Sequence, residues 1–230
     1  MSSSQLPLAV RLMNFFGRGA TAIGLQPVNL SLEKLLQTAM DNTGLSDFGE
    51  EDFRAPLALL LEGLEKEADL SLLGRIIARS DLVRTLENRL GFVQLFKQHP
   101  EIVEQRIERP IFVVGPPRSG TTIFHDLLVM DPDNRVPLTW ETARPLPPPE
   151  TATYRSDPRI AQAQADLDNV DKLLPQFKTM HPMGAERAQE CGTMTSHDFT
   201  SMIYFVQFYV PTYDRFVIEQ VAGDELPDAT

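Results

Sequence analysis

One short run of residues has the types and spacing needed to hold an anion. Residues 115–122 read GPPRSGTT and stand between an apolar run and a helical pattern. Glycines at this spacing let backbone N–H groups converge on a phosphate at a helix N-terminus, where the helix dipole adds about half a positive charge. Arg118 offers a cationic fork, and Ser119, Thr121 and Thr122 offer hydroxyls. The sequence therefore predicts a phosphate-binding loop.

This loop differs from the one that binds nucleoside triphosphates. The lysine that reaches the terminal phosphates in a Walker A loop is replaced by Thr121, and the cation is instead Arg118, inside the loop. The pattern favours an anion smaller than a magnesium nucleotide, or of another shape. A nucleotide kinase or NTPase with a degenerate loop remains an alternative, and it would bind ATP with magnesium.

Composition narrows the class of protein. The 230 residues are 42% hydrophobic and carry a net charge of −11, which disfavours wrapping a nucleic-acid backbone. The single Cys191 excludes an internal disulfide, no metal-ligand spacing occurs, and no apolar run is long enough to span a membrane. We therefore expect a metal-free cytoplasmic protein with no nucleic-acid partner; the sequence leaves the oligomeric state open.

The elements around the loop indicate the fold class. Residues 111–114 (IFVV) form a β-branched and aromatic run of the kind buried in a parallel sheet, and a helical pattern covers 121–130. Residues 158–174 are again helical, whereas 202–210 suits either a strand or a buried helix. We predict an α/β fold, a P-loop-like parallel sheet preceded by an all-helical module.

The helical module is expected over residues 1–107. Ser31 suits an N-cap and Gly44 a helix end, and Ser71 or Asp81 can begin later helices. The first 32 residues contain arginines but no acid, so they suit either a helix packed on its own protein or an interfacial helix or transit peptide. A protein whose working part is this module, without catalysis, is a further alternative.

A family resemblance rests on several runs. FVVGPPRSGTT at 112–122, Asp131-Pro132 and Trp140-Glu141-Thr142 resemble the 5′-phosphosulfate loop and following turn of sulfotransferases that use 3′-phosphoadenosine 5′-phosphosulfate (PAPS). The PPPE and HPMGAE stretches are similar to a bacterial branch of that family. The resemblance implies domains at 1–107 and 108–230, the second being the N-terminal part of a P-loop-like sulfotransferase domain. It also implies transfer of a sulfuryl group to a hydroxyl on a small molecule, glycan or lipid.

The resemblance also implies site residues. The cofactor would be held by consecutive loop residues: Pro117, Arg118, Ser119, Gly120, Thr121 and Thr122. Arg118 would stabilise charge on the moving sulfate, and Glu141, 23 residues further on, would be the base for the acceptor's proton. Glu141 could instead cap or solvate a turn. His181 is the rival base, although a lone histidine is more often a structural hydrogen-bonding residue.

Part of the family pattern is missing. Such enzymes have a later strand and helix with an arginine and a serine that grip the 3′-phosphate, and nothing like this segment occurs before Thr230. The chain therefore looks C-terminally truncated. We expect the chain as given to bind the nucleotide weakly and to show no transfer alone, because at least two charge-assisted bonds to that phosphate would be absent.

Overall fold

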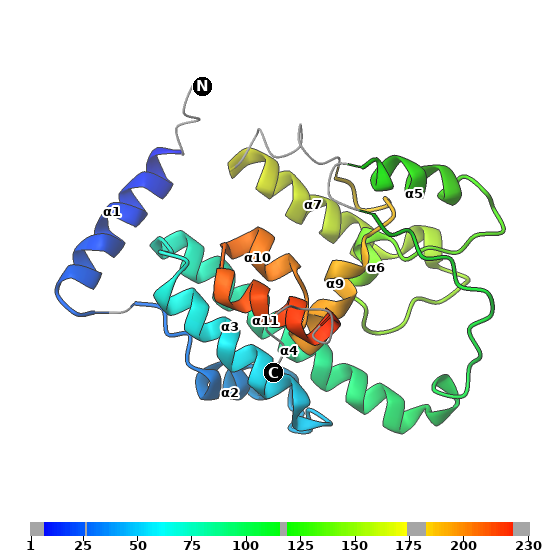
Figure 1. Cartoon of the computed structure of the whole chain (residues 1–230), viewed down its shortest axis with the longest axis horizontal. Helices are drawn as coiled ribbons and strands as arrows, with labels where there is room; N and C mark the ends of the chain where they lie inside the picture. Colours follow the sequence, from blue (N-terminus) through cyan, green and yellow to red (C-terminus); the bar gives the residue numbers. More distant parts are fainter. Residues whose placement is uncertain (1–6, 26, 116–118, 174–182, 223–230) are drawn as a thin grey trace. The chain divides into compact units, whose positions relative to one another are not determined.

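The structure is a computed structural model that describes residues 7–25, 27–115, 119–173 and 183–222 (Figure 1). The chain divides into two compact units. The first comprises Met1–Gln94 and Cys191–Thr230, and the second comprises Leu95–Glu190. Two stretches far apart in the sequence thus build the first unit, whereas the second is continuous.

The first unit is helical throughout its described elements. Its helices are α1 (Leu8–Ala22), α2 (Leu32–Thr43), α3 (Arg54–Lys66), α4 (Leu72–Gln98, whose last residues reach the second unit), α9 (Cys191–Thr195), α10 (Ile203–Phe208) and α11 (Pro211–Ala222), with 3₁₀ turns at Glu51–Phe53 and Ser196–Asp198. The segment 202–210, which the sequence left open between strand and helix, is helical in α10.

Local signals set several of these boundaries. Ser31 occupies the predicted N-cap position of α2, although its side chain makes no capping hydrogen bond, and Gly44 ends the helix with a left-handed φ of 69°, as predicted. Ser71 Oγ accepts the N–H of Gly74 at 3.2 Å, which fixes the start of α4. Asp81 begins no helix, because α4 runs through it without a break.

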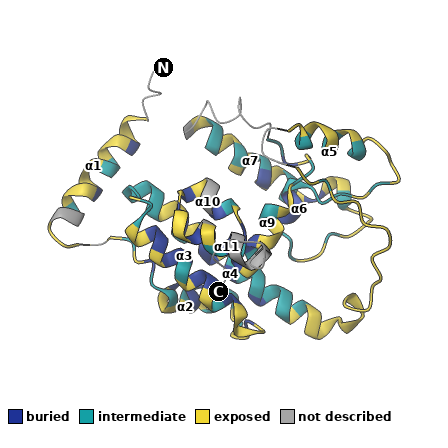
Figure 2. Cartoon of the chain, in the orientation of Figure 1, coloured by how far each residue is buried: buried dark blue, intermediate teal, exposed yellow. Residues whose placement is uncertain are grey.

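Leucines at helical spacing on α2, α3 and α4 make one core (Figure 2). Residues 199–217 complete it. Its fully buried members include Leu35, Leu57, Leu60, Leu64, Leu82, Leu86, Leu90, Phe199, Val210 and Tyr213. A Cβ on Gly63 would lie 3.2 Å from Val210, so the glycine lets the residue before α11 approach α3 closely.

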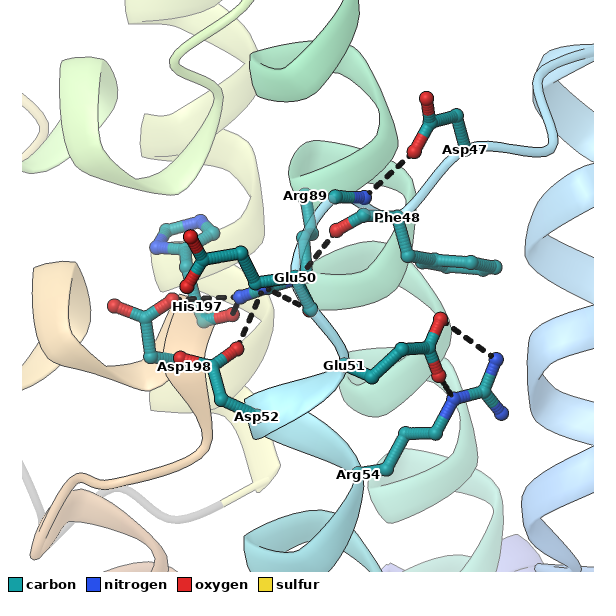
Figure 3. A network of polar contacts seen from close by, with 10 residues as sticks. Asp47, Phe48, Glu50, Glu51, Asp52, Arg54, Arg89, His197 and Asp198 are labelled. Atoms are coloured by element: carbon teal, nitrogen blue, oxygen red, sulfur yellow. Dashed lines mark hydrogen bonds and ion pairs between the residues drawn. The ribbon is translucent and has the colours of Figure 1, made fainter.

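Arg89 of α4 organises the polar side of this core (Figure 3). Its guanidinium donates to the carbonyl oxygens of Phe48 and Glu50, each at 2.9 Å, and pairs with Asp52 and Asp198. It also lies over a phenylalanine ring, 4.4 Å from the centroid. One nearly enclosed cation thus joins the turn at 48–52 to the segment that begins at residue 191.

The second unit has shorter elements and a smaller core. It contains α5 (Thr121–Val129), α6 (Thr139–Ala143) and α7 (Pro158–Leu173), with 3₁₀ turns at Pro100–Ile102 and Tyr154–Ser156. The helical predictions for 121–130 and 158–174 are therefore confirmed over residues 121–129 and 158–173, and residue 174 lies outside the described residues. Its buried cluster consists of Trp140, Ala163 and Ala185, with Leu138, Tyr154 and Ile160 packed against it.

The predicted parallel sheet is wrong for the described residues. They contain no β-strand, and their one isolated bridge joins Leu138 and Ala188 in antiparallel fashion. Residues 111–114 are irregular, and the side chains of Phe112 and Val114 are 81% and 89% exposed. A parallel strand needs neighbours to satisfy its backbone groups, and no described segment pairs with this run. Its strand-like composition therefore does not produce a strand.

No helix among the described residues is long and apolar enough to cross a membrane.

Candidate functional site

Glycines border the phosphate loop predicted from the sequence, of which the structure describes residues 115 and 119–122. A Cβ added to Gly115 would lie 2.8 Å from Ser119 Oγ and 2.8 Å from Thr121 Cγ2, closer than real Cβ atoms come. Gly120 has a φ of 92°, a backbone conformation that favours glycine, and its carbonyl accepts the N–H of Phe124 at 3.1 Å to begin the helix. Both glycines are therefore required by the shape of the turn.

The described loop residues 119–122 lie at the N-terminus of α5. Ser119 and Gly120 are exposed, and Thr121 and Thr122 are half-buried in the first turn of the helix. Orphan N–H groups at such a terminus attract anions. Pro117, Arg118 and His181 lie outside the described residues, so their predicted roles stay predictions.

Glu141 is buried in the first turn of α6 and accepts three hydrogen bonds. Its Oε2 atom accepts the N–H of Leu138 and the hydroxyl of Tyr154, each at 2.8 Å, while Oε1 pairs with Nη2 of Arg135. The bond from Leu138 is one half of a capping box, so the capping role is present in the structure. Burial and the bond donated to Glu141 raise the pKa of Tyr154.

The same carboxylate lines an open cavity of about 570 Å³. Arg135 and Tyr154 stand beside it, and the guanidinium of Arg135 lies 5.6 Å from the centroid of the Tyr154 ring. The rest of the wall consists of Pro149, Thr151, Ala152, Arg155 and Ser156. Capping and access are therefore compatible: Glu141 holds the turn and also faces a space that a substrate can enter.

A dense set of contacts holds α6 in place. Trp140 is fully buried, with the Tyr154 ring 5.4 Å from its own and the Arg159 guanidinium 5.1 Å from its centroid. Arg159 also pairs with Asp157 at 2.6 Å and donates to the carbonyl of Arg144 at 3.0 Å. The Arg159 side chain lowers the pKa of Asp157 to about 2. Glu141 thus sits on a braced turn.

Arg187 links the helix after the loop to the helix that carries Glu141. Its guanidinium pairs with Asp126 of α5 at 2.6 Å, and its carbonyl accepts the N–H of Thr139 at 2.9 Å. Sequence reasoning missed this positioning residue. The two charges stand 61 positions apart, and no local pattern relates them.

Metal binding has no candidate in the part of the chain that the structure describes, because no group of three or more His, Cys, Asp and Glu side chains gathers there. His125 is half-buried on α5, and His99 is exposed with its Nδ1 atom 3.0 Å from Glu101 Oε1. The described residues offer an exposed helix N-terminus at the loop and a buried carboxylate that lines a cavity.

Comparisons with known proteins agree with this arrangement. The model of the sulfotransferase family matches residues 110–227, just over half of the chain. No curated protein matches. Two solved structures are similar: sulfotransferase STF1 from Mycobacterium tuberculosis H37Rv, at 33% identity and a TM-score of 0.67, and sulfotransferase STF9 from Mycobacterium avium, at 28% identity and 0.71.

The alignments cover 81% and 85% of this chain but only 52% and 50% of the STF1 and STF9 chains. The chain thus spans about half the length of these solved relatives. The family match includes both the loop at the start of α5 and the carboxylate of Glu141 beside the cavity. The chain belongs to the sulfotransferase family.

Proposed function

We propose that this chain binds PAPS through residues 117–122 and takes part in transferring its sulfuryl group to a hydroxyl acceptor. The observation that carries the proposal is the cradle at Gly115, which a single Cβ would fill, at the start of a helix within the family match. Ser119, Thr121 and Thr122 would donate hydrogen bonds to the phosphosulfate, and Arg118 would add a charge-assisted bond. The donor, when bound, supplies the sulfuryl group.

Glu141 is proposed as the base. Its Oε2 atom is fixed by Leu138 and Tyr154, which orients the carboxylate, whereas Oε1 is held by Arg135, whose side chain is 65% exposed. An exposed arginine can turn toward solvent without disturbing the buried core. Oε1 would then receive the acceptor's proton while Oε2 keeps its two donors.

The acceptor hydroxyl is proposed to enter the cavity that Glu141 lines. Its walls combine aliphatic side chains with hydroxyls and a second guanidinium, that of Arg155. Arg155 has no ion-pair or hydrogen-bond partner among the described residues. The cavity therefore suits a polar acceptor, such as a sugar or another compound with several hydroxyls.

A calorimetric titration tests donor binding. We expect the product nucleotide, 3′-phosphoadenosine 5′-phosphate, to bind better than ATP with magnesium. Arg118→Ala should weaken binding about ten- to hundredfold, because charge-assisted hydrogen bonds contribute about 1.5–3 kcal/mol. Arg106→Ala, at an exposed arginine 3.9 Å from Glu108, is the matched control and should bind as wild type. Tighter binding of ATP would instead identify a nucleotide kinase or NTPase.

The rate of sulfuryl transfer, measured in any preparation that shows transfer, tests whether Glu141 is the base. Glu141→Gln keeps an oxygen that can accept the Leu138 N–H but removes the basic group, so it should preserve nucleotide binding and lower turnover by about 10²–10⁴. His181→Ala should do less. The opposite order of effects would assign the base to His181.

A further inference from the structure

Most of helix α1 is exposed (Figure 2), and its large apolar side chains face solvent. Leu8, Leu12, Phe15 and Phe16 are all exposed, the two phenylalanines by 71% and 68%. Their spacing of four, three and one places them on one face of the helix. Burying apolar surface is favourable by about 25 cal/mol per Å², and these exposed side chains forgo that free energy when the helix lies in water.

The opposite side of α1 is the one that contacts the protein. Asn14 Oδ1 accepts the N–H of Leu73 at 3.1 Å, and a Cβ on Gly17 would lie 2.5 Å from Leu72 Cβ. Val10, in the same stripe, is buried. The helix is therefore held by one small apolar residue, an amide and a glycine, and this attachment fixes the apolar face outward.

Charge on this segment differs from charge on the rest of the chain. Arg11 and Arg18 line a groove with Leu8, Leu12 and Phe15, and all 32 acidic residues follow residue 32. A protein of net charge −11 is repelled from an anionic surface except where such a segment faces it. Both arginines border one edge of the apolar face, where they could reach lipid phosphates.

We propose that α1 binds the surface of an anionic lipid bilayer, with Leu8, Leu12, Phe15 and Phe16 among the acyl chains and Arg11 and Arg18 at the phosphates. Fifteen residues of helix measure about 22 Å, less than the roughly 30 Å of hydrocarbon, so the helix lies in the interface plane. This surface is separate from the loop and the cavity, and it does not depend on the proposed sulfuryl transfer.

Flotation with lipid vesicles tests the proposal on the whole chain. We expect binding to vesicles of phosphatidylcholine with 30% phosphatidylglycerol, weaker binding to pure phosphatidylcholine, and loss of binding at high salt. The Phe15→Ser/Phe16→Ser variant should lose binding. Arg11→Gln/Arg18→Gln should weaken binding to anionic vesicles about tenfold or more, with little change on neutral ones. Circular dichroism checks that both variants remain helical.

Two matched variants make the outcome specific. Val103→Ser/Ile107→Ser removes two equally exposed apolar side chains from the other unit and should bind as wild type. Arg118→Ala should also bind vesicles normally, which separates this proposal from the donor site. The proposal would be overturned if the wild type did not bind vesicles, or if the Val103→Ser/Ile107→Ser variant lost as much binding as Phe15→Ser/Phe16→Ser. It would also be overturned if the protein formed a dimer that Phe15→Ser/Phe16→Ser abolishes, because a second copy would then cover this face.

Discussion

The two units bury their residues very differently. In the first, leucines from three helices and aromatic residues from 199–213 form one core, and the cation of Arg89 is nearly enclosed. In the second, three residues make up the buried cluster, and α5, which follows the phosphate loop, has no buried residue at all. The first unit is thus stabilised mainly by apolar packing. The second depends on polar ties such as Arg187 to Asp126.

This difference separates the densely packed unit from the unit that holds the candidate site. Elements that bind ligands are drawn from the less densely packed parts of a fold, because they need exposed polar groups and an open approach. The loop at 115–122 and the cavity beside Glu141 both belong to the second unit. Substitutions in the first unit should therefore change the free energy of unfolding, and those in the second should mainly change the site.

The largest effect is expected for a core leucine of the first unit. Leu86→Ala removes a fully buried side chain and should lower the free energy of unfolding by about 3 kcal/mol. Leu127→Ala, on exposed α5, should change it by less than about 0.5 kcal/mol. Urea unfolding followed by far-UV circular dichroism measures both. Equal losses would contradict the comparison between the units.

The second-largest loss of stability is expected for a substitution of Arg89. Arg89→Ala leaves the carbonyls of Phe48 and Glu50 without their donor and removes two ion pairs, which should cost about 2–3 kcal/mol. Arg84→Ala, which breaks an exposed pair with Asp81 on the same helix, should cost about 0.5 kcal/mol or less. Urea unfolding of both variants measures this difference. A large loss of unfolding free energy in Arg84→Ala would show that exposed ion pairs also stabilise this unit.

A smaller effect, visible as a pH dependence, is expected at His197. Its Nδ1 lies 3.0 Å from the Met194 carbonyl and its Nε2 3.1 Å from the Asn88 amide, an arrangement that suits a neutral ring. Burial lowers its pKa below the ordinary 6.5; the hydrogen bond to the Met194 carbonyl and the charge of Asp198 oppose this, and nearby Arg84 adds a smaller lowering. Because the unfolded chain then binds the proton more readily, this contribution to stability is complete above pH 6.5 and is lost as the pH falls.

Thermal melts at pH 7.5 and pH 5.5 check this sign. The melting temperature of the wild type should fall on acidification more than that of His197→Gln, which no longer titrates. His99→Gln, at an exposed histidine of the second unit, serves as the control and should keep the wild-type profile. If the melting temperature of His197→Gln fell as steeply on acidification as that of the wild type, the pH dependence would belong to other groups.

The smallest effect should be local, at Asp157. Hydrogen bonds from Arg159 lower its pKa from 3.8 to about 2, so its contribution is present above pH 3.8 and is lost as the pH falls toward 2. Arg159 lies over the ring of Trp140, the single tryptophan of the chain. Fluorescence should change between pH 4 and 2 in the wild type, whereas Asp157→Asn should show a shifted emission already at pH 7. An unchanged spectrum in the variant would show that Asp157 does not position Arg159.

Much of the helical architecture could be predicted because its signals are local. Ser31 and Gly44 mark the ends of α2, Ser71 marks the start of α4, and the glycines at 115 and 120 mark the turn before α5. Capping and left-handed φ angles depend on residues within one helical turn, so a single sequence is enough to locate them.

The sheet could not be judged from the same kind of signal. Residues 111–114 have the composition of a buried strand, but a strand exists only where another segment supplies its hydrogen bonds, and composition does not provide that segment. The opposite error occurred at Asp81, where a good capping residue stands inside a continuous helix because burial of Leu82 and Leu86 favours continuing it.

By itself, the sequence determined the glycine-bounded loop, the caps and the amphipathic stripes of the helices, because neighbours along the chain fix these features. Only the tertiary structure decided that residues 191–217 pack with the N-terminal helices, that Arg135 and Tyr154 hold Glu141, and that Arg187 ties α5 to α6. It also decided that α1 contacts the protein through Asn14 and Gly17 and turns its phenylalanines outward. The physical reason is that an amphipathic pattern specifies which side chains share a face, whereas the partner of that face depends on segments many residues away.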